Sequence, residues 1–155
     1  MKRLLASVIL ASVVFAAVPA GARTGIGIIA GEPTGLSLKT WLDDRHAVDV
    51  ALGWSFSGNT NLHAHADYLW HDFGLLRPSG MPGQVPVYYG VGARFKLHDD
   101  DRDDDRLGVR IPLGVSWVAA EAPLDVFLEL APVLDLVPST DLDLDAAIGV
   151  RFWFR

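Results

Sequence analysis

The amino-acid sequence predicts an all-β fold, an eight-stranded antiparallel up-and-down transmembrane β-barrel with a polar, filled lumen. In eight segments, apolar side chains alternate with polar or small ones, which is the period of a strand whose two faces meet different surroundings. Most of these segments approach the roughly ten residues that a tilted strand needs to cross a bilayer. After residue 22 no stretch shows a helical period, and a closed barrel is the other structure that satisfies its backbone in lipid.

The N-terminal segment indicates export. A basic start precedes an apolar run over residues 4–18, and Ala20-Gly21-Ala22 is a small-x-small cleavage site. The run is short for a membrane-spanning helix, which needs about 20 residues. We therefore expect residues 1–22 to be a cleaved signal peptide, and residues 23–155 to form the barrel in the outer membrane of a Gram-negative-type bacterium.

Charge and cysteine content narrow the possible functions. The formal net charge is −6, and loss of Lys2 and Arg3 with the signal peptide makes it about −8. Nucleic-acid binding is therefore not expected, since it needs a basic surface. The chain has no cysteine, so a core, a closed sheet or the membrane must stabilise it. It has no glycine-rich phosphate loop between a strand and a helix, and we expect no cofactor.

The first four predicted strands cover residues 24–30, 35–42, 46–56 and 61–73. Turn-forming residues separate them, as in the Gly-Glu-Pro-Thr sequence of residues 31–34. Their apolar faces carry Ile26 and Ile28, then Leu36, Leu38 and Leu42, then Val48, Val50, Leu52, Trp54 and Phe56, then Leu62, Ala64, Ala66, Tyr68 and Trp70.

The last four predicted strands cover residues 87–97, 106–118, 124–136 and 142–154. Their alternation is clearest in the final strand, whose even positions are all apolar and whose odd positions include Asp143, Asp145 and Arg151. We expect this strand to close the ring by pairing with residues 24–30. Pro112 and Pro132 each remove a ladder hydrogen bond, so bulges or irregular pairing are expected there.

The polar faces would form a charge network inside the barrel. Buried charges must pair, and the set is nearly balanced. Small residues on the same faces suit a narrow lumen, and aromatic residues near the ends of the apolar faces suit interfacial belts. In the alternative, a soluble sheet, the charged faces would point outward into water. The set comprises Lys39, Asp49, His63, His65, Asp67, Arg94, Lys96, Arg110, Asp125, Glu129, Asp143, Asp145 and Arg151.

Two patterns are candidates for metal binding. His63, His65 and Asp67 share one strand face, and imidazole and carboxylate groups are metal ligands. The alternative is a hydrogen-bond network with Asp49, Lys39 or Arg94, because spacing alone does not make three ligands converge. The second candidate is the acidic segment, which could bind Ca²⁺ but lacks EF-hand spacing and is more typical of a solvated loop. Its carboxylates are Asp99, Asp100, Asp101, Asp103, Asp104 and Asp105.

The C-terminal residues Gly149-Val150-Arg151-Phe152-Trp153-Phe154 give the chain a family resemblance. It resembles small outer-membrane barrels of the OmpA/OmpX-like type, including the OmpA-like barrel proteins of spirochaetes. The resemblance implies that Gly149, Phe152 and Phe154 form the signal that the barrel-assembly machinery recognises. Two departures are the extra Arg155 and Ala147, which stands where a polar residue is common.

The sequence thus predicts a monomeric outer-membrane barrel in contact with lipid and lipopolysaccharide. We expect a structural or surface-interaction role through its outer loops rather than an open pore, since eight strands enclose too narrow a lumen. One alternative is a lipid A- or phospholipid-modifying enzyme using Ser55 or Ser116 with a histidine, although no G-x-S-x-G motif is present. Another is a soluble periplasmic barrel that binds an apolar ligand.

Overall fold

The computed structural model describes residues 23–55, 61–97 and 105–154. The predicted signal peptide and most of the acidic segment lie outside these residues. The described part contains nine strands: β1 Thr24–Gly31, β2 Gly35–Trp41, β3 His46–Ser55, β4 Asn61–Asp72, β5 Val87–Leu97, β6 Arg106–Arg110, β7 Leu113–Val118, β8 Leu124–Val137 and β9 Asp141–Phe154. No helix in this part is long and apolar enough to span a membrane.

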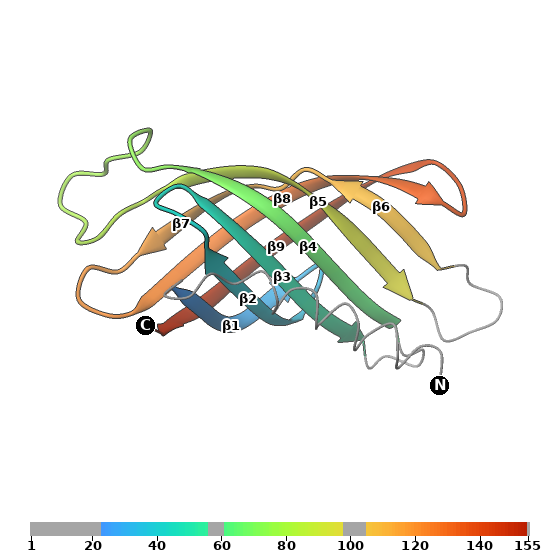
Figure 1. Ribbon diagram of the computed structural model, residues 1–155, viewed down its shortest axis with the longest axis horizontal. Coiled ribbons are helices and arrows are strands. Elements are labelled where there is room, and N and C mark those ends of the chain that lie inside the picture. The colour runs from blue at the N-terminus through green and yellow to red at the C-terminus, as the bar shows by residue number, and fades with distance from the viewer. Residues whose placement is uncertain (1–22, 56–60, 98–104, 155) are drawn as a thin grey trace.

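The strands form one closed antiparallel ring. Sequential neighbours pair from β1 to β5, and the ring continues through β6 and β7 to β8 and β9. It closes between β9 and β1, where Ile28 lies opposite Val150. The predicted pairing of the last strand with the first is therefore confirmed. Figure 1 shows the strands running obliquely around the ring, with the C-terminus, the start of β1 and the long 73–86 loop at one end.

The described residues form nine strands where the sequence predicted eight, because Pro112 divides one of them. β6 and β7 both pair with β5 on one side and β8 on the other, so together they occupy one position in the ring. The carbonyl groups of Pro112 and Pro132 accept the N–H groups of Gly90 and Ile111 at 2.9 and 3.0 Å. Pro132 itself lies within an unbroken β8, opposite Leu144.

Alternation places the charged side chains inside the ring and the apolar ones outside. Large outward-facing residues such as Ile28 and Leu142 are 62% and 77% exposed. The inward face also carries an apolar layer that the sequence analysis did not single out. The layer comprises Ile29, Ala51, Leu69, Tyr88, Phe127 and Ala147.

Glycines at two inward positions make room for large interior side chains. A Cβ on Gly114 would overlap the ring of Tyr88, and one on Gly149 would overlap the ring of Phe127. Both rings are almost fully buried. Small residues on the polar face are therefore a packing requirement of a narrow interior.

Candidate functional site

The charged interior is the candidate site, and it gathers the predicted polar residues from every part of the ring. Lys96 and Asp143 are partly exposed near the end opposite the C-terminus. The other eleven predicted residues are more than nine-tenths buried: Lys39, Asp49, His63, His65, Asp67, Arg94, Arg110, Asp125, Glu129, Asp145 and Arg151. Asp135 and His71 are buried on the same face, and continued alternation along their strands is the signal that places them there.

Arg94 of β5 binds three carboxylates across the interior. Its Nη2 lies 2.8 Å from both oxygens of Asp135 on β8. Its Nη1 donates to Asp145 at 2.7 Å and to Asp143 at 2.9 Å, both on β9. Four charge-assisted contacts offset much of the cost of burying this guanidinium.

The cluster around Arg94 continues towards the turn between β1 and β2. An oxygen of Glu32 lies 3.5 Å from Lys96 Nζ and 3.5 Å from His63 Nδ1. Lys96 Nζ is also 3.5 Å from Asp143, and the second nitrogen of His63 lies 3.8 Å from Asp145. This end of the interior is thus occupied by opposite charges.

Arg110 of β6 organises the middle of the interior. Its Nη2 donates to Glu129 in a very short contact, and its Nε lies 3.1 Å from Asp67. Its Nη1 donates to His65 Nδ1 at 2.7 Å. The hydroxyl of Tyr88 donates to the second oxygen of Glu129 at 2.8 Å. Side chains from β4, β5, β6 and β8 therefore meet at one place.

Arg151 and Lys39 occupy the part nearer the C-terminus and the start of β1. Arg151 donates to Asp49 and to Ser37, each at 2.9 Å, and its guanidinium lies 3.8 Å from the centre of the Phe127 ring. Lys39 lies opposite Asp49 in the strand register, yet its ammonium donates to His71 Nε2 at 2.7 Å.

Aromatic rings complete the surroundings of Lys39. Its Nζ lies 4.9 Å from the ring of Trp41 and 5.0 Å from that of Tyr88, within the range of cation–π attraction. Since the ammonium only donates, His71 accepts at Nε2 and carries its hydrogen on Nδ1, which lies 3.1 Å from the carbonyl oxygen of Arg45. A histidine and two rings therefore take the place of a carboxylate partner.

The predicted metal ligands are only partly brought together. Potential ligand atoms of Asp49, His65 and Asp67 lie within 4.8 Å of one another, with Asp49 in place of His63. Because Arg110 donates to Nδ1 of His65, a neutral His65 carries its hydrogen on Nε2 and offers no lone pair to a metal. The cluster therefore fits the hydrogen-bond network better than a metal site.

The buried carboxylates outnumber the buried cations. Among the described residues that are more than nine-tenths buried, six carboxylates accompany four cations and three histidines. Both oxygens of Asp67 and both oxygens of Asp125 have no hydrogen-bond partner. Neutralisation is thus uneven: Arg94 is well paired, whereas Asp125 has its nearest cation at 4.0 Å.

The remaining predicted residues occupy other surfaces. Phe152 and Phe154 point outward with ring centres 5.4 Å apart. Gly149 occupies an inward position, where its backbone lies against the ring of Phe127. Of the acidic segment only Asp105 lies within the described residues, where it is exposed before β6. Asp99, Asp100, Asp101, Asp103 and Asp104 lie outside them.

Comparison with solved structures reveals a similar fold. The N-terminal β-barrel domain of Pseudomonas aeruginosa OprF matches with a TM-score of 0.56 and 16% sequence identity, over 86% of this chain and 96% of that chain. The chain folds as a β-barrel. Its sequence matches no protein-family model and no curated protein. At this identity the likeness shows the fold alone, so the function of this barrel has to be argued from its own side chains.

Proposed function

We propose that the chain is a small outer-membrane β-barrel of the OmpA/OmpX-like type, with eight strand positions and a filled interior. The observation that carries the proposal is the reversed polarity of the sheet. A soluble barrel buries its apolar face, whereas here Arg94, Arg110 and Arg151 are buried and Leu142 is 77% exposed. That distribution suits a wall surrounded by lipid hydrocarbon.

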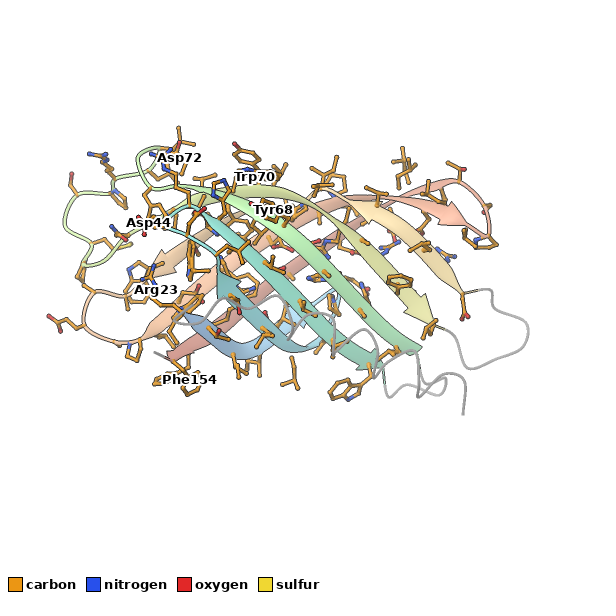
Figure 2. All side chains as sticks on the ribbon, in the orientation of Figure 1. Arg23, Asp44, Tyr68, Trp70, Asp72 and Phe154 are labelled. Carbon is orange, nitrogen blue, oxygen red and sulfur yellow. The ribbon has the colours of Figure 1, made fainter. Side chains whose placement is uncertain are left out.

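Outward-facing aromatic residues support the same proposal. Figure 2 places Tyr68, Trp70 and Phe154 towards the end of the barrel that carries the C-terminus. The rings of Trp70 and Tyr89 are stacked with centres 5.9 Å apart. Aromatic belts of this kind are typical of the boundary between hydrocarbon and headgroups.

The proposed role is structural or depends on surface interactions, without an open pore. The three arginine clusters cross the interior at successive levels, so side chains fill the space that a pore would need. Interactions with lipopolysaccharide or other surface molecules would then use the loops at the end opposite the C-terminus. The C-terminal Gly149, Phe152 and Phe154 would serve the barrel-assembly machinery, and a monomer is sufficient for all these roles.

The proposal includes no catalytic role. Ser116, one of the two predicted nucleophiles, is buried in the interior and forms no hydrogen bond with a described histidine. Its partner candidate His71 accepts from Lys39, and His65 accepts from Arg110. The side chain of Ser55 lies outside the described residues.

Membrane fractionation tests the proposal most simply. We expect the chain in the outer-membrane fraction, with a gel mobility that changes on heating as the barrel unfolds. Recovery in the soluble periplasmic fraction would support the apolar-ligand alternative and overturn the proposal. An altered lipid A or phospholipid profile on deletion of the gene would support the enzymatic alternative, and we expect no such change.

A further inference from the structure

A hollow of about 500 Å³ lies between the 42–45 turn and the 73–86 loop, at the end of the barrel that carries the C-terminus. Its lining includes Arg45 from the turn and Phe73, Leu76, Arg77 and Val85 from the loop. The hollow is separate from the charged interior, and neither arginine belongs to the predicted network.

In the described part of the chain, neither arginine is directly paired with a carboxylate, although Asp43 and Asp44 precede Arg45 in the same turn. Both side chains are exposed, and neither guanidinium has a hydrogen-bond or ion-pair partner among the described residues. The one carboxylate in the lining is Asp72. An oxygen of Asp72 accepts the backbone N–H groups of Gly74 and Leu75 at 2.7 and 3.0 Å. An anion in the hollow would therefore meet two available guanidinium groups.

Contacts with the outward-facing aromatic residues place the hollow at the same height along the barrel as the aromatic belt. His46, which follows Arg45, has its ring 5.9 Å from that of Tyr68 and 6.4 Å from that of Trp70. On the loop side, Trp117 Nε1 donates to the carbonyl oxygen of Pro82 at 2.9 Å. Since belt residues lie at the level of lipid headgroups, the hollow opens where phosphate groups are concentrated.

The loop also presents apolar side chains beside the arginines. Leu75, Leu76 and Met81 are 67%, 43% and 50% exposed. Apolar groups next to cations are typical of segments that lie in the interfacial plane of a membrane, where they contact acyl chains while the cations meet anionic headgroups.

We propose that Arg45 and Arg77 bind the phosphate of an anionic phospholipid in the leaflet at this end of the barrel, while Leu75, Leu76 and Met81 contact its acyl chains. Arginine is suited to this role because its planar fork donates two hydrogen bonds to one phosphate. The inference rests on the proposed membrane location.

Native mass spectrometry of the full chain, refolded in detergent, tests the site with phosphatidylglycerol and phosphatidylcholine as probes. We expect phosphatidylglycerol to bind at least tenfold more tightly. Arg45→Gln and Arg77→Gln should each weaken it about fivefold, as expected for an arginine near a charged membrane surface. The matched control is Arg23→Gln. Arg23 is at the same end of the barrel, with its guanidinium over the ring of Trp41, and its replacement should leave lipid affinity unchanged.

Equal affinity for the two lipids, or unchanged affinity in both glutamine variants, would overturn the inference. Inorganic phosphate that competes at the same concentration as the lipid would show a site for free phosphate and would also overturn it. Heat-modifiable mobility of each sample in vesicles separates the two proposals. A chain that fails to insert overturns the proposed function, whereas a chain that inserts without lipid preference overturns only this inference.

Discussion

At the scale of single residues, hydrogen bonding distinguishes two buried aspartates of β8. Asp135 receives two bonds of 2.8 Å from Arg94, whereas neither oxygen of Asp125 has a hydrogen-bond partner. Both side chains are about 1% exposed. A buried carboxylate stabilises the fold only when its partners offset the loss of hydration.

Asp135→Asn should lower the free energy of unfolding by about 2 kcal/mol, since it removes charge-assisted bonds from a buried guanidinium. Asp125→Asn, the matched substitution on the same strand, should change it by less than about 1 kcal/mol, because no hydrogen bond is lost. Urea unfolding of the vesicle-inserted barrel measures both values. Equal losses in the two variants would contradict this account of the interior.

Asp43, in the turn between β2 and β3, should show a lowered pKa. It accepts the backbone N–H groups of Arg45 and His46, both at 2.8 Å, and these bonds hold its carboxyl pKa below the usual range. The lowered pKa stabilises the turn above the unfolded pKa of about 4, and this contribution is lost as pH falls through the folded value. NMR titration of the Asp43 carboxyl carbon should give a lower midpoint than an unstructured peptide of the same sequence, and an equal midpoint would refute the prediction.

The contacts of Lys39 could not be predicted from the sequence. Alternation along its strand predicted an inward position for Lys39, and in the structure it lies opposite Asp49. Its actual partner is His71, and Asp49 is bound by Arg151 of β9. Contacts across the interior depend on side-chain length and on how the ring closes. The order of residues along one strand does not reveal which side chains will meet.

At the scale of strands, Pro112 accounts for the difference between eight predicted segments and nine strands. Ile111 and Pro112 separate β6 from β7, while β8 remains continuous beside both. Proline explains why a break was predictable there. The same rule suggested irregularity at Pro132, but in an antiparallel strand its missing N–H points to the side where Ile111 and Pro112 already interrupt the ladder, so β8 loses little.

A prediction at this scale concerns the packing of β7 against the interior. Gly114→Ala should destabilise the barrel by about 1–3 kcal/mol through overpacking. The added Cβ would overlap the ring of Tyr88, which is held by its hydrogen bond to Glu129. Gly74→Ala is the control, because its Cβ would meet neighbouring atoms at ordinary distances of 3.4 Å or more. Thermal unfolding in detergent compares the two variants, and a Gly114→Ala barrel as stable as the control would contradict the packing role.

At the scale of the whole molecule, the two-residue period of the sequence and the balance of its charges determine the architecture. The two-residue period of the sequence predicted that the chain forms strands. The near balance of positive and negative charges predicted which face lies inside. The long 73–86 loop lies at the end that carries the C-terminus, although simple barrels have short turns at one of their two ends. The hollow beside this loop was not predictable, because Arg45 and Arg77 are brought together only by the folded turn and loop.

The central claim is that the outer face of the ring lies in lipid, and spin labelling tests it directly. Leu128 and Ile148 face outward as a cross-strand pair near the middle of their strands, and the chain has no cysteine of its own. Labels on Leu128→Cys and Ile148→Cys in vesicles should collide often with oxygen and rarely with a water-soluble nickel reagent. A label on Glu121→Cys, in an exposed turn, should show the opposite. Nickel accessibility at Leu128 and Ile148 as high as at Glu121 would contradict the membrane barrel.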